Sequence, residues 1–219
     1  MIARLWGWYL DYWFVAWWQL RALFSSRVPR DFERGDRAPV LLLAGVYEPW
    51  YFLRRIGHRL NDAGHPVHVV GEIGYNRASI VDVAVLAARY LEEHDLRGVV
   101  LVAHSKGGLV GKQLMATTDR VAALVAVATP FGGSSLARLV PVRTIRAFDP
   151  RDVTITTLAS NLALNSRITS LYPRFDPHIP GGSRLEGATN VEYPLVGHFR
   201  LLGDARVIEG IESAVASVE

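Results

Sequence analysis

Four short aliphatic runs downstream of Pro39 constrain the fold of this chain more than any other feature. They are VLLLA at 40–44, VHVVG at 67–71, VVLVA at 99–103 and ALVAVAT at 123–129. Runs that are apolar on both faces are typical of central parallel strands with helices on both sides of the sheet. Amphipathic segments separate them, and further strands and helices are expected at 168–172, 191–196, 152–165 and 204–217. Strands alternating with helices imply right-handed crossovers, so we predict an α/β class with a mostly parallel sheet of about six strands.

Length and composition fit one folded domain over 28–219, preceded by a distinct segment over 1–27. Half of the 219 residues are apolar and 21% are charged, which excludes wholesale disorder. The chain contains no cysteine, so disulfides, thiol nucleophiles and thiolate metal sites are excluded. Its net charge of +3 comes from scattered basic residues, so we expect no nucleic-acid partner. The oligomeric state stays open.

The N-terminal segment is predicted to be an aromatic helix. Five of the six tryptophans lie in residues 1–24: Trp6, Trp8, Trp13, Trp17 and Trp18. A secretory signal needs an uninterrupted aliphatic core and a small-residue cleavage site, whereas Asp11 and bulky rings break this core. A membrane-spanning helix would hold Asp11 near the bilayer centre, at a cost of about 2.5–3.5 kcal/mol. We therefore expect a cytoplasmic chain.

A helical wheel separates this segment into two unequal faces. One narrow sector holds Arg4, Gly7, Asp11, Ala22 and Ser25, and a broad aromatic surface surrounds it. Aromatic rings of this kind favour the headgroup layer, so we interpret residues 1–24 as a helix peripherally associated with a membrane surface. The alternative is a helix packed on the folded domain or on a second subunit.

A serine follows the third aliphatic run directly and begins the next helix, in VVLVAHSKGGLVGK. This order is typical of a nucleophile elbow, a sharp turn that lifts a strained serine away from the sheet. The residues two before and two after the serine must be small, and Ala103 and Gly107 meet that demand. We therefore predict Ser105 as a nucleophile. The helix N-terminus behind it favours negative charge at the site.

Serine attack on an acyl carbon requires a base, and seven histidines are available. His198 follows a late strand and precedes the last helix. In an α/β fold with a nucleophile elbow, the base is expected at this position. His178 is the main competitor, because its loop is expected at the same edge of the sheet. The others, His104 included, suit structural roles.

A carboxylate that orients the base should follow the penultimate strand. Asp176 has this placement, and its rivals are Asp149, Asp152, Glu186 and Glu192. The chain order Ser105, Asp176, His198 differs from the orders of the other two main triad folds.

Two backbone amides are expected to stabilise an oxyanion. One belongs to Lys106, directly after the serine, and the other belongs to Val46, with Tyr47 next, in the loop after the first aliphatic run. We expect the Lys106 side chain to face solvent. A Ser-Lys dyad and a contact with an anionic substrate are the alternatives.

The segment between Pro130 and the helix at 152–165 is too short for a large lid, so the site should have a short cap and be accessible. We assign Tyr47, Trp50, Phe131 and Leu136 to substrate contact. Core packing is the alternative for Trp50, and a surface helix is the alternative for the segment that contains Leu136.

Four segments together resemble the α/β-hydrolase superfamily, near the small bacterial serine lipases and esterases: AHSKGGLVGK, LLLAGVYEPW, ATPFGGS and SRLEGATNVEYPLVGHFRLL. The resemblance covers about residues 39–215. It implies an α/β-hydrolase fold and carboxylic-ester hydrolysis through an acyl-enzyme, with Ser105 as nucleophile, Asp176 as acid and His198 as base. It also implies a small-molecule or lipid ester as substrate, with no metal and no organic cofactor.

Two residues depart from the family pattern. Ala44 stands where many members have histidine before the loop glycine, and Lys106 replaces a common apolar residue. These departures argue against a standard triglyceride substrate. An acyltransferase on the same triad and a non-catalytic, membrane-associated binding protein are the alternative functions.

Overall fold

The computed structural model describes residues 2–24 and 27–218, and its centre is a six-stranded parallel sheet. The strands are β1 (Val40–Leu43), β2 (Val67–Val69), β3 (Val99–His104), β4 (Val121–Val127), β5 (Ile168–Phe175) and β6 (Thr189–Val196). Their order across the sheet is β2-β1-β3-β4-β5-β6, with each neighbouring pair parallel. The predicted class and the six-stranded parallel sheet are therefore confirmed.

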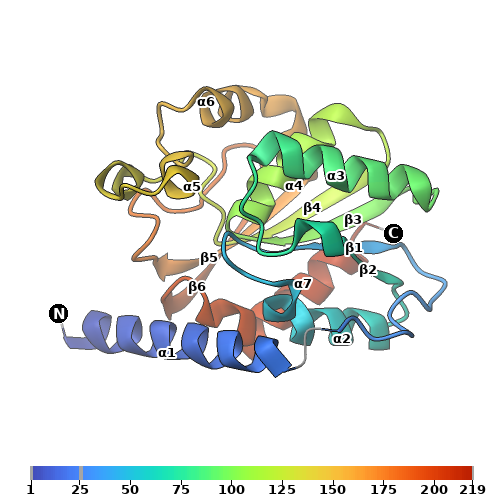
Figure 1. Cartoon of the computed structure of the whole chain (residues 1–219), viewed down its shortest axis with the longest axis horizontal. Helices are drawn as coiled ribbons and strands as arrows, with labels where there is room; N and C mark the ends of the chain where they lie inside the picture. The colour runs from blue at the N-terminus through green and yellow to red at the C-terminus, as the bar shows by residue number, and fades with distance from the viewer. Residues whose placement is uncertain (1, 25–26, 219) are drawn as a thin grey trace.

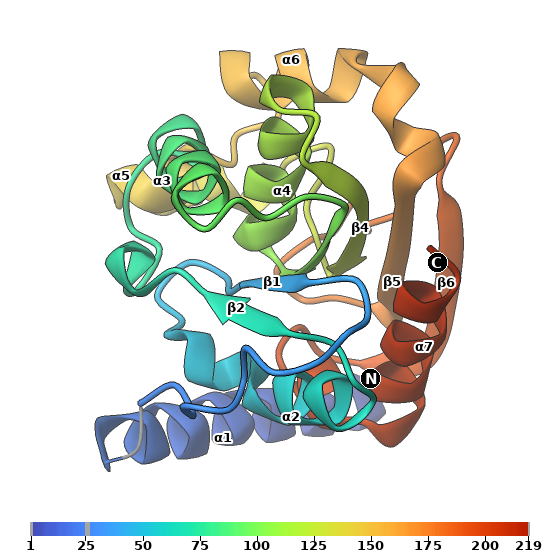
Figure 2. The same cartoon turned by 90° about the vertical axis from the view of Figure 1, so that its right-hand side faces the viewer.

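Helices cover both faces of this sheet (Figures 1 and 2). One face carries α3 (Ile80–Glu93), α4 (Lys106–Thr117) and α6 (Val153–Ser160), and the other carries α1 (Ile2–Phe24), α2 (Arg54–Asp62) and α7 (Ala205–Ala216). The connections contain α5 (Arg143–Arg146), η1 (Trp50–Leu53), η2 (Gly71–Ile73), η3 (Ser135–Leu139), η4 (Leu162–Arg167) and η5 (Arg200–Gly203). The three-layer arrangement explains why the strand sequences are apolar on both faces.

The side chains of β1 alternate between two separate cores. Leu41 and Leu43 pack in the core under α3 and α4, whereas Val40 and Leu42 pack in the core with α2 and α7. All four are at most 3% exposed, so neither face of the strand meets solvent. A sheet buried in this way gives the loops at its carboxyl edge a rigid base, and ligands of open α/β sheets bind at that edge.

Helix α1 lies across the lower layer of the molecule in Figure 1 and contacts η1, β6 and η5. Among the described side chains, its inner face includes Gly7, Asp11, Trp18 and Ala22, all buried at helical spacing. Most of the small and polar sector expected from the wheel therefore packs on the folded domain. Ser25 and the side chain of Arg4, the other members of that sector, lie outside the described part of the chain.

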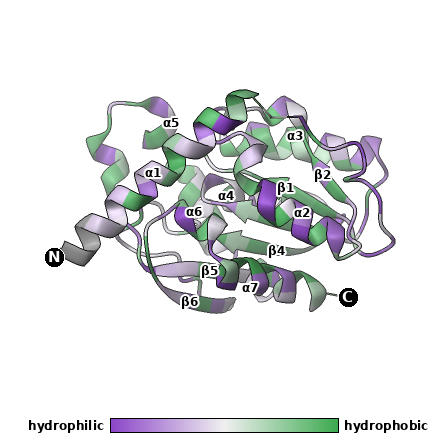
Figure 3. Ribbon diagram, turned by 90° about the horizontal axis from the view of Figure 1, so that it is seen from below, coloured by the Kyte–Doolittle hydropathy of each residue, from purple (hydrophilic) through white to green (hydrophobic). Residues whose placement is uncertain are grey.

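The outer face of α1 is almost entirely aromatic or aliphatic. Its exposed side chains include Trp6, Trp8, Tyr9, Tyr12, Trp13, Trp17, Leu20, Leu23 and Phe24. In Figure 3 the helix crosses the underside of the molecule beside the largely hydrophilic α2. Within residues 2–24 and 27–218, no helix is both long and apolar enough to cross a bilayer.

Candidate active site

Ser105 occupies a strained turn between β3 and α4. Its φ of 52° and ψ of −119° lie in a region that L-residues rarely adopt, at a cost of about 1–3 kcal/mol. The turn depends on close packing, because a Cβ at Gly107 would lie 2.0 Å from the Leu43 carbonyl oxygen. The strand–serine–helix arrangement expected of the elbow is therefore present.

The hydroxyl of Ser105, the imidazole of His198 and the carboxylate of Asp176 form a continuous chain of polar contacts. His198 Nε2 lies 2.9 Å from Ser105 Oγ, and His198 Nδ1 donates to Asp176 Oδ2 at 2.7 Å. The three residues follow β3, β6 and β5, so the parallel sheet brings them to one edge. All three are buried, at 7% exposure or less.

The charges around this chain favour an ionised Asp176 and a basic His198. Burial alone raises the pKa of the Asp176 carboxyl, but the His198 charge and hydrogen bonds from His198 and the His178 amide hold it below its ordinary value. Burial alone lowers the pKa of His198, and Asp176, Glu48 and Asp11 reverse that effect, so the pKa is raised. The imidazole is therefore a stronger base than in water.

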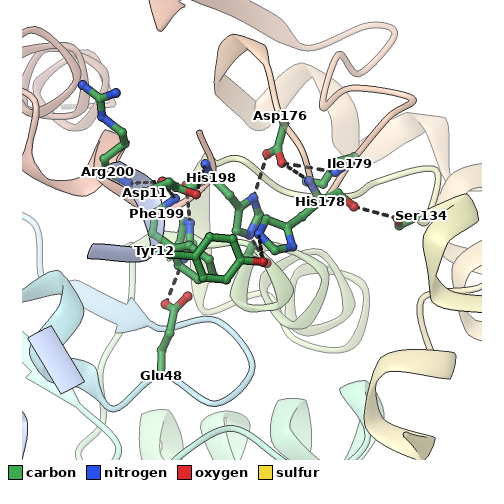
Figure 4. A network of polar contacts seen from close by, with 12 residues as sticks. Asp11, Tyr12, Glu48, Ser134, Asp176, His178, Ile179, His198, Phe199 and Arg200 are labelled. Atoms are coloured by element: carbon green, nitrogen blue, oxygen red, sulfur yellow. Dashed lines mark hydrogen bonds and ion pairs between the residues drawn. The ribbon is translucent and has the colours of Figure 1, made fainter. Parts of the chain in front are cut away.

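His178 lies beside this chain of contacts rather than within it. Its ring centroid is 5.1 Å from that of His198, and its Nε2 is 3.4 Å from the Tyr12 hydroxyl. Ser134 Oγ donates to the His178 carbonyl at 2.7 Å (Figure 4). Burial and the neighbouring His198 lower the pKa of His178 to about 4, so its ring is neutral at pH 7. The structure pairs Ser105 with His198, the preferred of the two histidines.

The loop after β1 presents its backbone to the same site. Tyr47 has a φ of 61°, and its amide donates to the Tyr75 carbonyl at 2.8 Å. The Tyr47 amide already has a hydrogen-bond acceptor, so Val46 is the better of the two amides expected in this loop as donors to an oxyanion. Val46 also lines the cavity that reaches Ser105.

The expectation that the Lys106 side chain faces solvent is wrong. The residue is 1% exposed, and its Nζ donates to the Asn76 carbonyl at 2.8 Å and to that of Ala78. Burial lowers the pKa of Lys106 to about 8, with Asp82 opposing the shift. The lysine links the start of α4 to the segment before α3, because its long apolar stem can be buried while the ammonium reaches main-chain oxygens.

His104 and Glu48 form a second buried pair behind the imidazole. Glu48 Oε2 accepts from the Gly45 amide and from His104 Nδ1, both at 2.9 Å. His104 Nε2 lies 3.1 Å from the carbonyl oxygen of His198. This pair links the loop after β1 to the main chain of His198, which agrees with the structural role expected of His104.

An apolar cavity of about 340 Å³ opens beside Ser105. Its walls come from α1, through Val15 and Gln19, and from the short cap over residues 134–148, through Leu136, Val140 and Ile145. Of the four residues assigned to substrate contact, Tyr47 and Leu136 also line the cavity.

The structure places the other two expected contacts elsewhere. Trp50 packs against the rings of Phe32 and Tyr51, which is the core alternative for this residue. Phe131 is 3% exposed in the core under α3 and α4 and lies beneath the Lys112 ammonium. Sequence position next to a loop does not decide which way a ring points, since the 3-10 turn at Trp50 directs it back into the core.

Two residues of this site went unrecognised in the sequence. Glu48 is an acid in a loop of small and apolar residues, and Asp11 is the single acid of α1. Such isolated charges in apolar segments are the available signal, because a buried charge needs partners. The sequence does not show which distant groups those partners are.

No protein-family model matches this chain. Three similar solved structures each share 17% identity or less with it. Mature lipase BlEst2 of Bacillus licheniformis is 15% identical with a TM-score of 0.66, over 84% of this chain and 94% of the lipase. The monoacylglycerol lipase of Paleococcus ferrophilus is 15% identical with a TM-score of 0.62, over 83% and 96%. An α/β-hydrolase fold protein of Burkholderia ambifaria is 17% identical with a TM-score of 0.58, over 84% and 92%. The chain therefore has the α/β-hydrolase fold that its motifs predict.

Proposed function

We propose that this protein is a serine hydrolase that cleaves carboxylic esters through an acyl-enzyme intermediate. The observation that carries the proposal is the pair of contacts made by His198, to Ser105 Oγ at 2.9 Å and to Asp176 Oδ2 at 2.7 Å. These contacts lie at the wall of an apolar cavity suited to an acyl chain. The names of the similar structures, which include lipases, agree with this chemistry.

The proposed reaction has two halves. Ser105 Oγ attacks the ester carbonyl carbon while His198 Nε2 accepts the hydroxyl proton, and Asp176 stabilises the imidazolium that results. The tetrahedral oxyanion is stabilised by the amides of Lys106 and Val46. Its collapse breaks the bond to the alcohol oxygen, which takes the proton from His198. Water then repeats the sequence on the acyl-enzyme and releases the carboxylic acid.

The test combines turnover with covalent labelling. The protein is incubated with a p-nitrophenyl ester series and with a fluorophosphonate probe, beside Ser105→Ala, His198→Ala and a control variant, Ser160→Ala, at an exposed serine of α6. We expect Ser105→Ala to lose both labelling and turnover, and Ser160→Ala to retain both. Labelling that survives in Ser105→Ala, or no labelling and no turnover in the unmodified protein, would overturn the proposal.

We also propose that the outer face of α1 lies on a membrane surface. Trp6, Trp13 and Phe24 are 61%, 63% and 83% exposed, an unusual density of solvent-facing rings. A cavity beside Trp17 is lined by four arginines, Arg21, Arg54, Arg55 and Arg59, of which Arg59 pairs with Glu212, and Glu209 is the acid among its lining residues. Aromatic rings next to guanidinium groups match the headgroup layer of an anionic bilayer.

Vesicle flotation tests this contact. We expect the protein to float with phosphatidylcholine vesicles that contain phosphatidylglycerol, and less with phosphatidylcholine alone. A triple Trp6→Ser, Trp13→Ser, Trp17→Ser variant should stay at the bottom, whereas Val85→Ser, Val153→Ser, Leu162→Ser, which removes exposed apolar groups elsewhere, should float. Equal behaviour of both triple variants contradicts the proposal. So does a dimer that is held together by the three tryptophans and does not float.

A further inference from the structure

Asp11 binds the main chain that carries His198. Its carboxylate is completely buried and accepts three consecutive amides of the loop after β6. Oδ2 accepts from His198 N at 2.9 Å, and Oδ1 accepts from Phe199 N at 2.8 Å and Arg200 N at 2.9 Å (Figure 4). This contact joins residues 187 to 189 positions apart in the chain.

Two glycines, Gly7 and Gly197, allow α1 and the loop after β6 to approach this closely. A Cβ at Gly197 would lie 2.6 Å from Asp11 Oδ1, and the φ of +129° at this residue suits glycine alone. A Cβ at Gly7, one turn earlier on the inner face of α1, would lie 2.6 Å from Val196 Cγ1. Both glycines permit the helix to approach the loop closely, so the contact is a specific interface.

Both main-chain polar groups of His198 bind side chains from other elements. Asp11 on α1 accepts a hydrogen bond from the His198 amide, and His104 at the end of β3 contacts the His198 carbonyl oxygen. The imidazole contacts Ser105 and Asp176 in turn. The position of the ring therefore depends on the groups that hold its backbone.

We infer that Asp11 is a positioning residue for His198, so that helix α1 is part of the catalytic apparatus. The inference rests on the proposed ester hydrolysis, in which His198 is the base. Without the carboxylate, the buried amide of His198 and the partly buried amides of Phe199 and Arg200 lose their acceptor, and the loop must move toward water or another acceptor. A shift of about 1 Å at the imidazole is enough to lower a catalytic rate about 100-fold.

Two substitutions separate this role from simple attachment of the helix. Asp11→Asn keeps the shape, but when its oxygen faces the amides of Phe199 and Arg200, its NH₂ group faces that of His198. Asp11→Ala removes both acceptor oxygens and with them all three hydrogen bonds. Trp18→Ala is the matched control, since its ring lies on the same face of α1 and packs against Phe14 and Tyr51. Asp62→Asn removes an exposed acid elsewhere.

Two measurements are made on the full chain: steady-state hydrolysis of a p-nitrophenyl ester, and NMR titration of ¹⁵N-labelled imidazoles, with the His198 signal assigned by His198→Ala. The charged or titratable groups around His198 are Asp11, Glu48, His104, Asp176 and His178. Removal of the Asp11 charge takes away one interaction that favours the imidazolium, so the His198 signal should titrate at lower pH in Asp11→Asn.

We expect Asp11→Ala to lower kcat by about 10- to 100-fold and Asp11→Asn by about 10-fold, with KM changed less than about threefold. Trp18→Ala should lower the melting temperature with a much smaller loss of kcat, and Asp62→Asn should change neither. Wild-type kcat and wild-type His198 titration in both Asp11 variants would overturn the inference. So would a Trp18→Ala variant with the same losses as Asp11→Ala. If the unmodified protein shows neither hydrolysis nor labelling, the proposed ester hydrolysis is wrong. The NMR titration of His198 then still decides whether Asp11 acts on this histidine.

Discussion

Replacement of Gly107 by alanine tests whether the turn at Ser105 depends on close contact between β1 and α4. A Cβ at this position lies 2.0 Å from the Leu43 carbonyl oxygen and 2.9 Å from that of Ala44, whereas real Cβ atoms stay beyond 3.0 Å. The strand and the helix must therefore separate by about 1 Å. Both opposing atoms belong to the backbone and cannot rotate away as a side chain does.

The expected effects follow from that displacement. Overpacking of this kind costs about 1–3 kcal/mol, which lowers the melting temperature of a chain of this length by roughly 2–12 °C. Ser105 lies two residues before the displaced point, and misplacement by about 1 Å lowers the rate about 100-fold. The loss should appear in both kcat/KM and the rate of fluorophosphonate labelling, because both need the serine in place.

Thermal unfolding and labelling are measured beside Gly71→Ala, where a Cβ meets no atom within 4 Å. This control changes the same residue type without the collision and should behave as the unmodified protein does. A Gly107→Ala variant with the wild-type melting temperature and labelling rate would refute the packing argument for the elbow.

Three further predictions follow. His198 must be neutral to act as a base, so kcat/KM should fall as the pH falls through the His198 pKa, which lies above the ordinary histidine value. In a pH–rate profile, Asp176→Asn should lower both the His198 pKa and the rate. Val140→Trp should fill part of the cavity and move the preference among p-nitrophenyl esters toward shorter acyl chains, whereas an unchanged chain-length profile would place the acyl group elsewhere. Burial lowers the pKa of Lys112 from 10.5 to about 8, so between these pH values the unfolded chain holds the lysine proton and the folded chain does not. The free energy of unfolding should therefore rise with pH over this range, and the rise measured by urea unfolding should be smaller in Lys112→Met.

The two faces of α1 have different chemistry because they contact different surroundings. The inner face carries Asp11, whose charge is matched by three amides of the loop after β6. The outer face carries rings such as Trp6 and Trp13, which find no comparable cover within the described chain. If both proposals hold, the helix places the cavity beside a lipid surface while it holds His198 in place.

Much of the chain of polar contacts from Ser105 through His198 to Asp176 was predictable because it depends on local patterns. The small residues around Ser105 mark a sharp turn, and the placement of Asp176 and His198 after late strands brings them to the edge where β3 ends. Parallel topology makes this inference strong, since all carboxyl ends of the strands lie on one side. The predicted positions of these three residues relative to the strands agree with the structure.

Other features were not predictable, because they depend on contacts between segments far apart in the chain. The sequence predicts a Lys106 side chain in solvent, but main-chain oxygens of the segment before α3 accept hydrogen bonds from its buried ammonium group. Trp50 and Phe131 were assigned to substrate, and their backbone directs both into the core. Direction of a side chain is decided by tertiary packing, which sequence spacing does not encode.

The sequence by itself determined the layers of the fold, the strained serine and the order of the three polar residues, since hydrophobic period and turn chemistry act over a few neighbouring residues. Only the tertiary structure decided which surface the N-terminal helix covers and what its one acid binds. A buried carboxylate needs partners, but any set of free amides can satisfy it. The amides of His198, Phe199 and Arg200 became those partners because the folded sheet and the glycines at 7 and 197 bring the helix against that loop.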